Sequence, residues 1–141
     1  MNVIKEFSGE YSFLSNMFPC EVTFEGFTYP CSESAFQAAK CLDVTERMKF
    51  TSLTGFEAKK KGKKVPLRKD WEDVKVDVMY KVLKSKFSDP ILRRKLLATK
   101  DAELIEGNHW FDMFWGVDLY SGVGANVLGN LLMKVRSELS E

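Results

Sequence analysis

Hydrophobic residues recur at two spacings along this chain, and the two spacings predict different elements. In residues 22–29, β-branched and aromatic side chains flank Glu25-Gly26. This pattern is typical of a β-hairpin whose tight turn needs the positive φ that Gly26 can adopt. Pro30 ends the segment. In the longer segments apolar residues return every three or four positions, as they do on the buried face of a helix.

The helical spacing predicts six helices separated by caps and turn residues. Thr54 and Glu57 form a capping-box pattern, and Ser32 is the expected cap of the first helix. Asp70 is the expected cap of the longest helix. The predicted spans are 33–42, a short helix after Thr45, one opening after Thr54, about 71–87, about 90–98, and 125–139. The apolar stripe of the longest helix comprises Val74, Val78, Met79, Val82 and Leu83.

These elements predict one domain of α+β class over residues 1–141, mostly helical, with a small N-terminal β-hairpin or sheet. A short strand is expected over 103–106. A chain of 141 residues is long enough for a hydrophobic core, and 45% hydrophobic and 29% charged residues are ordinary for a soluble protein. No internal repeat or linker divides the chain.

The net charge of +1 gives no global field that would attract nucleic acid or an anionic membrane. A local basic patch remains compatible with it. No apolar run has the length of a membrane span, and the first residues lack a signal-peptide pattern. We therefore expect a cytoplasmic protein with no membrane partner.

The cysteines and the single histidine argue against a zinc centre. Cys20, Cys31 and Cys41 contain no C-x-x-C pair, and His109 is the only histidine. Neither a structural zinc site nor a His-rich catalytic metal site is expected from this set. A magnesium ion held by carboxylates stays open, as does a Cys–His nucleophile.

Residues 108–116, Asn-His-Trp-Phe-Asp-Met-Phe-Trp-Gly, fit neither the strand nor the helix period. Large rings beside an acid in an irregular segment suit a pocket that stacks on a planar or sugar ligand and places the Asp112 carboxylate against it. Trp110 and Trp115 would form the walls. The alternative is a loop that plugs the core.

A second candidate lies on the first predicted helix. Glu33, Gln37 and Lys40 are spaced i, i+4, i+7, which places an acid, an amide and an amine on one helix face. Such a row can supply a general acid or base, an orienting donor, and an amine nucleophile or cation. A solvated helix face explains the same spacing.

Two further segments allow a functional and a structural interpretation. The glycines before Asn126 could free backbone N–H groups at the start of the last helix for a phosphate, or could simply form the turn that starts it. The lysine run 59–64, together with Arg68, is either a solvated surface or a phosphate-binding patch.

Four segments then form a pattern in a fixed order. They are Phe13-Leu14-Ser15-Asn16, the run from Tyr29 to Lys40, the Trp-x-Asp-x-x-Trp-Gly motif of Trp110 to Gly116, and Gly124-x-Asn126-x-Leu128-Gly129 continuing to Arg136. Together they resemble the NADAR (YbiA-like) family over about residues 13–139. One departure is Ser34, where family members often carry His, so a role of that His does not carry over.

The resemblance implies an N-glycosidase. Some members cleave the N-glycosidic bond of phosphoribosylamino-pyrimidine intermediates of riboflavin synthesis, and others remove ADP-ribose from guanine bases. The implied partner is a small-molecule nucleotide or an ADP-ribosylated guanine base, or nucleic acid that carries such a base. No cofactor is required for this chemistry, and the oligomeric state is left open.

The candidate residues fit that reaction. Breaking a ribosyl C1–N bond builds positive charge on the sugar, which a carboxylate stabilises. Glu33 is the first choice for the catalytic residue, with Lys40 and Asp112 as partners. Lys40 would either attack an opened ribose as a Schiff-base nucleophile or bind phosphate. The predicted substrate-binding residues are Asn16, Gln37, Trp71, Trp110, Trp115, Gly124 and Asn126, with Trp71 equally suited to the core.

Two other functions remain open from the sequence. One is a non-catalytic module that binds ADP-ribose or a nucleotide. The other is an interaction protein acting against a host or toxin factor, which would leave the row at Glu33 outside any cleft. Release of free base from a ribosylated substrate distinguishes the enzyme from both.

Overall fold

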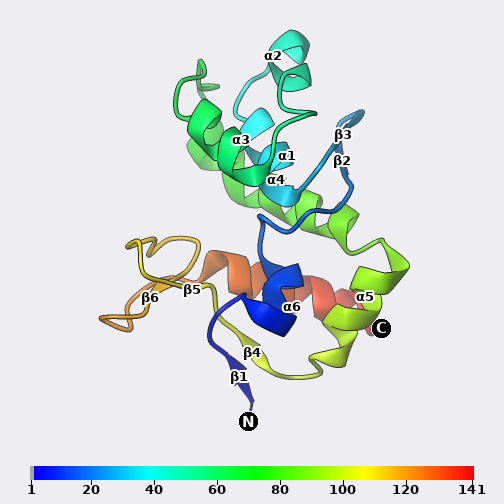
Figure 1. Ribbon diagram of the computed structural model, residues 1–141, viewed down its shortest axis with the longest axis vertical. Helices are drawn as coiled ribbons and strands as arrows, with labels where there is room; N and C mark the ends of the chain where they lie inside the picture. Colours follow the sequence, from blue (N-terminus) through cyan, green and yellow to red (C-terminus); the bar gives the residue numbers. More distant parts are fainter. Residues whose placement is uncertain (1) are drawn as a thin grey trace. The chain divides into compact units, whose positions relative to one another are not determined.

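The computed structural model describes residues 2–141 (Figure 1). Its internal contacts divide the chain into two compact units. The central unit comprises residues 16–88, and the terminal unit comprises the residues up to 15 together with 89–141. Each unit is described by itself, and the prediction of a single domain over residues 1–141 stays a prediction.

The central unit consists of a hairpin and four helices. Strands β2 (Val22–Phe24) and β3 (Phe27–Tyr29) are antiparallel, with Thr23 opposite Thr28. The predicted hairpin is confirmed, and its turn residues Glu25 and Gly26 both have positive φ, 45° and 92°. The helices are α1 (Ser32–Ala38), α2 (Val44–Met48), α3 (Gly55–Gly62) and α4 (Trp71–Lys86).

The caps of these helices are partly those that the sequence predicted. The capping box of Thr54 and Glu57 is present at α3. The predicted cap Ser32 is wrong, because Cys31 is the N-cap of α1 and its Sγ accepts a hydrogen bond from the Ser34 N–H. Asp70 stands at the N-cap position of α4, but its carboxylate binds Arg68 and caps no N–H group.

The first helix also ends earlier than predicted. α1 stops at Ala38, so Lys40 lies on the turn that follows the helix and is not part of it. The main-chain N–H of Lys40 still donates to the carbonyl of Gln37, 3.2 Å away. This turn-type bond tightens the end of the helix and keeps Lys40 close to the row that begins at Glu33.

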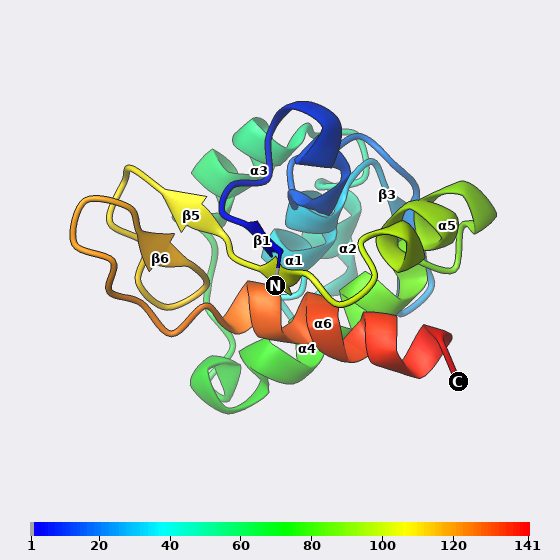
Figure 2. The same ribbon diagram turned by 90° about the horizontal axis from the view of Figure 1, so that it is seen from below.

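The terminal unit contains α6 (Val127–Leu139), α5 (Pro90–Ala98), a 3-10 helix η1 (Gly9–Leu14) and four two-residue strands. β1 (Val3–Ile4) pairs in parallel with β4 (Glu103–Leu104), and β5 (Gly107–Asn108) pairs in parallel with β6 (Val117–Asp118). Figure 2 shows β5 beside β6 and the long axis of α6. The α+β class with mainly helical content is confirmed.

Each unit has its own apolar core. In the central unit, α4 buries Trp71, Val78, Met79, Val82 and Leu83, while Val74 of the predicted stripe is half-buried. In the terminal unit, α6 buries Leu128, Leu131, Leu132 and Val135. Leu139 is half-buried. No helix within residues 2–141 is long and apolar enough to span a bilayer.

A substitution at Gly129 tests how closely α6 packs on β4. A Cβ at this position would overlap the carbonyl oxygen of Leu104 and the side-chain amide of Asn126. We expect Gly129→Ala to lower the free energy of unfolding by about 1–3 kcal/mol, because backbone must move to admit the methyl group. Chemical denaturation measures this change. Ser137→Ala, on the exposed side of α6, is the control, and equal stability of the two variants would contradict the close approach.

Candidate functional site

The polar row on α1 begins with a pair of bonded side chains. The Nε2 of Gln37 donates to a carboxylate oxygen of Glu33 at 2.6 Å. Gln37 is buried, with 5% of its surface exposed, whereas Glu33 is half-buried. Glu33 lies in the first turn of α1, where the helix dipole favours the charged carboxylate. The row therefore presents an oriented carboxylate at the surface of the central unit.

Asn16 lies directly beside this carboxylate-bearing residue. Its main-chain carbonyl accepts a hydrogen bond from the main-chain N–H of Glu33 at 2.9 Å. The Asn16 Nδ2 lies 3.7 Å from the Sδ of Met79, and its buried Oδ1 accepts no hydrogen bond within residues 2–141. A buried acceptor without a donor costs free energy. The binding of substrate by Asn16 stays a prediction.

Gly62 allows α3 to press against the row. A Cβ at Gly62 would overlap the Oε1 and Cδ of Gln37. The Gln37 oxygen thus faces the backbone of α3 and its nitrogen faces Glu33. The structure consequently shows Gln37 as a residue that orients Glu33, and its predicted contact with substrate stays a prediction.

Lys40 has an unusual electrostatic environment. Its side chain is half-buried, and burial lowers the pKa of its amine below the ordinary lysine value. The negative charge of Glu33 acts in the opposite direction and raises that pKa, while the positive charges of Lys63 and Lys59 lower it. An amine with a lowered pKa is more often in the neutral, nucleophilic form.

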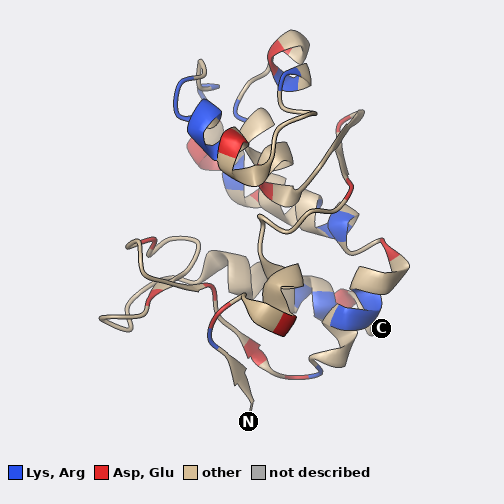
Figure 3. Cartoon of the chain, viewed as in Figure 1, with Lys and Arg blue, Asp and Glu red and all other residues tan. Residues whose placement is uncertain are grey.

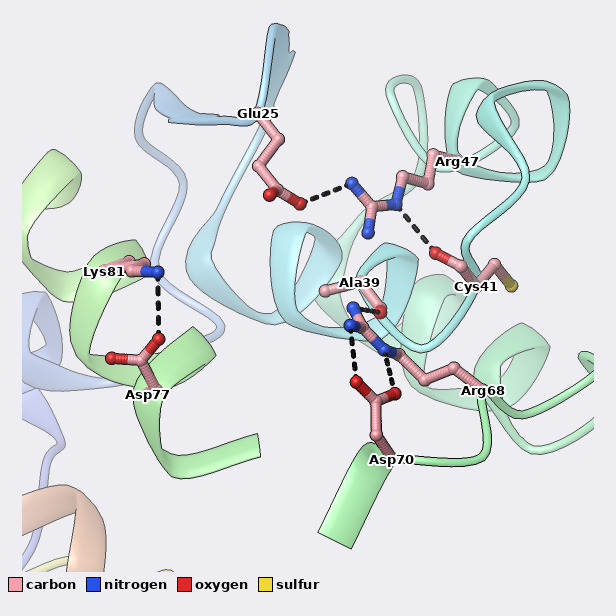
Figure 4. A network of polar contacts seen from close by, with 8 residues as sticks. All are labelled: Glu25, Ala39, Cys41, Arg47, Arg68, Asp70, Asp77 and Lys81. Carbon is pink, nitrogen blue, oxygen red and sulfur yellow. Dashed lines mark hydrogen bonds and ion pairs between the residues drawn. The ribbon is translucent and has the colours of Figure 1, made fainter. Parts of the chain in front are cut away.

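Arg68 fixes the turn that carries Lys40. Its main-chain N–H donates to the Lys40 carbonyl at 2.9 Å, and its Nη1 lies 3.4 Å from the Ala39 carbonyl oxygen. The other side of its guanidinium makes a bidentate pair with Asp70, at 2.7 and 3.0 Å (Figure 4). The planar fork of arginine suits this double role. The structure shows a role of Arg68 that neither sequence interpretation included, because its bonds hold the end of α1 in place.

Arg47 likewise binds a main-chain carbonyl just after α1. Its Nε donates to the Cys41 carbonyl and its Nη1 pairs with Glu25, each at 2.7 Å (Figure 4). Arg47 is buried against the Phe24 ring. This contact ties α2 to the hairpin, and no local sequence pattern signals it, because Glu25 and Arg47 are far apart in the chain.

A cavity of about 690 Å³ lies next to this turn. It is formed by residues 41–46 and 66–70, and its lining includes Cys41, Glu46 and Arg68. None of Glu33, Gln37 and Lys40 lines it. The polar row holds the chemically competent groups and is therefore the candidate site. The cavity lies next to the row, because Arg68, which lines it, donates its main-chain N–H to the Lys40 carbonyl.

Trp71 is buried, with 5% of its surface exposed. Its ring packs against that of Phe36, with 5.0 Å between ring centroids. The structure thus places Trp71 in the core of the central unit, and its role as a wall for substrate stays a prediction.

The aromatic segment of the terminal unit is organised by two polar side chains. The buried Oδ1 of Asn108 accepts from the N–H groups of Trp110 and Asp112, and its Nδ2 donates to the Asp112 carbonyl. The Asp112 carboxylate accepts from the N–H groups of Phe114 and Trp115, at 3.1 and 2.9 Å. These bonds replace regular secondary structure in the segment. The catalytic role of Asp112 stays a prediction.

The rings of this segment differ in exposure. Trp110 and Phe111 are exposed, at 61% and 69%, whereas Trp115 is half-buried and meets Phe114 edge to face. A loop that plugs the core would bury these rings, so the segment as a whole is not a core plug. The predicted stacking of Trp110 and Trp115 on a substrate remains untested.

Four N–H groups at the start of α6 are bonded to the aromatic segment. The N–H groups of residues 125–128 donate to the carbonyls of Met113, Gly116, Phe114 and Trp115. The side chain of Asn126 bridges the Leu104 carbonyl and the Glu106 N–H, both at 2.9 Å. Gly124 lies against the Gly116 carbonyl, with no room for a Cβ. Gly124 and Asn126 thus contact other residues of the protein, and their binding of substrate stays a prediction.

Comparisons with known proteins place these motifs in a family. The NADAR domain model matches residues 4–140. The chain belongs to the NADAR domain family. The predicted resemblance is thereby confirmed, since the match covers nearly the whole chain.

Two similar proteins carry functional names. The N-glycosidase YbiA of Escherichia coli is 40% identical over 137 residues, which are 94% of this chain and 84% of that protein. A riboflavin biosynthesis protein of Vibrio vulnificus is 39% identical over 136 residues, but this chain spans only 36% of its length. The NMR structure of E. coli YbiA matches with a TM-score of 0.86 and 37% identity, covering 99% of this chain and 85% of that one.

The charges around Lys40 give a test of the row. We expect Glu33→Gln to lower the pKa of Lys40 further, because the Glu33 carboxylate is the acid that raises it. Lys63→Gln should raise the pKa instead. NMR titration of the ¹³C-dimethylated lysines measures both shifts. Glu72→Gln, an exposed acid paired with Lys75, is the control. An unchanged Lys40 pKa in both the Glu33→Gln and the Lys63→Gln variant would contradict the closeness of these two charges to the Lys40 amine.

Proposed function

We propose that this protein hydrolyses the C1–N bond of a ribosylated base or nucleotide. The class, a hydrolase acting on N-glycosidic bonds, follows from membership of the NADAR family and from the relatives named N-glycosidase YbiA. The observation that supports the mechanism is the oriented, half-buried Glu33 carboxylate beside the Lys40 amine. The substrates in the proposal are ADP-ribosyl-guanine and the phosphoribosylamino-pyrimidine intermediates of riboflavin synthesis.

The chemistry of the row suits an oxocarbenium-like transition state. As the C1–N bond breaks, electrons leave with the base and positive charge grows on the ribose ring. A fixed carboxylate at Glu33 stabilises that charge and can accept a proton from the attacking water. Gln37 holds the carboxylate without neutralising it, because an amide carries no charge. Residues of this chain therefore supply the proposed catalysis.

The two substrate classes share the ribose and differ in the base and the phosphates. Incubation with ADP-ribosylated guanosine and with a phosphoribosylamino-pyrimidine, followed by chromatography of the free base, decides between them. A protein that binds both compounds and releases no base from either would instead be a non-catalytic nucleotide-binding module. Cytoplasmic location and recognition of nucleic acid carrying the modified base are further parts of the proposal.

Glu33→Gln tests the principal residue. The change keeps the shape of the side chain and removes the charge that stabilises the sugar cation. We expect turnover to fall at least about a hundredfold, as for a principal general acid or base. The rate of base release and the circular dichroism spectrum are measured together. Glu72→Gln is the matched control, and near-wild-type turnover of a folded Glu33→Gln protein would remove Glu33 from the mechanism.

Lys40→Arg separates two roles of the amine. If Lys40 forms a Schiff base with an opened ribose, borohydride traps a sugar adduct on Lys40 during turnover. Arginine keeps the positive charge but stays protonated and cannot attack, so turnover should be lost. Mass spectrometry of the trapped protein locates the adduct. An active Lys40→Arg protein, with no adduct on the wild type, would leave Lys40 as a cation only.

A further inference from the structure

The segment from Lys59 to Lys69 is the most strongly charged part of the chain. It contains seven cations, Lys59, Lys60, Lys61, Lys63, Lys64, Arg68 and Lys69, and no acid, although the net charge of the protein is only +1. Figure 3 shows Lys and Arg gathered over the second half of α3 and the loop that follows it, with uncharged residues between them.

Most of these cations are not neutralised by acidic side chains. Within residues 2–141, Lys59, Lys60, Lys63 and Lys64 are exposed and take part in no salt bridge. Arg68 alone among the seven is paired, with Asp70. The negative end of the α3 dipole compensates only about half of one charge. The repulsion within the segment is therefore largely uncompensated in the protein alone.

Two of these lysines lie next to the part of α3 that packs on the polar row. Lys59 and Lys63 are spaced i, i+4, and Lys63 keeps a helical backbone as the C-cap of α3, so the two share one side of the helix. Gly62, next to Lys63, lies against Gln37, one turn before Lys40. The positive charges of Lys63 and Lys59 lower the pKa of the Lys40 amine, whereas Lys60 and Lys64 are not among the causes of its shift.

We propose that Lys59 and Lys63 form a phosphate-binding subsite beside the Glu33 row, which receives the phosphate carried on the 5′ side of the ribose. The inference rests on the proposed function, because it places the ribose at Glu33. A phosphate dianion there would relieve the repulsion among the lysines and would position C1 of the sugar by a charge far from the breaking bond. Substrates that lack the phosphate would bind poorly. Both a phosphoribosyl compound and an ADP-ribosyl compound carry this group.

The test compares two lysine pairs with the same change in charge. Lys59→Gln/Lys63→Gln removes the proposed subsite, and Lys60→Gln/Lys64→Gln removes two charges from the same run on the neighbouring side of α3. Titration calorimetry of the full chain with ribose 5-phosphate, ADP-ribose and unphosphorylated ribose measures binding. Lys59→Arg/Lys63→Arg keeps the charge and should keep the affinity.

We expect the Lys59/Lys63 pair to lower the affinity for a phosphorylated probe at least about tenfold, since hydrogen bonds to charged groups are among the stronger ones. The Lys60/Lys64 pair should change it less than about twofold, and binding of ribose should be unaffected by either. Loss confined to ribose 5-phosphate identifies a terminal phosphate as the ligand, and loss confined to ADP-ribose identifies a diphosphate. Both results support the subsite.

Two results would overturn the subsite. One is undiminished binding of both phosphorylated probes by the Lys59/Lys63 variant. The other is equal loss in the two pairs, especially with a parallel loss of affinity for a single-stranded oligonucleotide, which would make the run a general polyanion surface.

Kinetics separate this inference from the proposed function. For a hydrolysed substrate, the Lys59→Gln/Lys63→Gln change should raise KM about tenfold or more, and Lys59→Arg/Lys63→Arg should leave KM nearly unchanged. If the substrate is hydrolysed and KM does not change when these lysines are replaced, the subsite is overturned and the proposed glycosidase function is unaffected. Phosphate binding that depends on Lys59 and Lys63, in a protein that hydrolyses no N-glycoside, would overturn the proposed function alone.

Discussion

The close approach of α3 to α1 at Gly62 is the constraint on which the candidate site of the central unit depends. With no side chain at this position, the backbone of α3 lies directly on the Gln37 amide. The amide is then confined between a helix backbone and the Glu33 carboxylate, so its nitrogen must face the acid. One glycine thus fixes the orientation of the glutamine, and the glutamine fixes that of the glutamate. It also holds α3, which carries Lys59 and ends at Lys63, against the helix of the row.

Lys40 shows how such a site can combine charges of both signs without neutralising them. Burial and the neighbouring lysines favour the uncharged amine, and Glu33 favours the ammonium ion. Because the folded pKa lies below its ordinary value, the unfolded chain binds more protons at this group between the two values. The contribution of Lys40 to stability therefore rises with pH over that interval. At neutral pH the half-buried, protonated amine of Lys40 therefore lowers the stability of the folded protein.

Much of the local structure could be predicted from the sequence, because caps and turns act over a few residues. The hairpin turn at Glu25-Gly26, the capping box at Thr54 and the start of α5 at Pro90 were all predictable in this way. The early end of α1 was not, since the clamp by Arg68 comes from a residue far along the chain. The buried Lys86 shows a missed signal, because its helical spacing places it on the buried face with Met79 and Val82.

The aromatic segment resisted prediction for a different reason. Its hydrophobic pattern matches no regular period, because its backbone groups bond to two sets of partners. N–H groups of the segment donate to the Asn108 and Asp112 side chains, and carbonyls of the segment accept from the first N–H groups of α6. Phe111 even adopts a positive φ of 63°, which a phenylalanine tolerates only when surrounding bonds impose it. A backbone held this firmly can leave its large rings exposed without losing its shape. Exposed rings on a rigid loop lose little entropy when a ligand stacks on them. The polar bonds of Asn108 and Asp112 therefore fix the backbone that carries the exposed rings, and the stacking of these rings on a substrate stays a prediction.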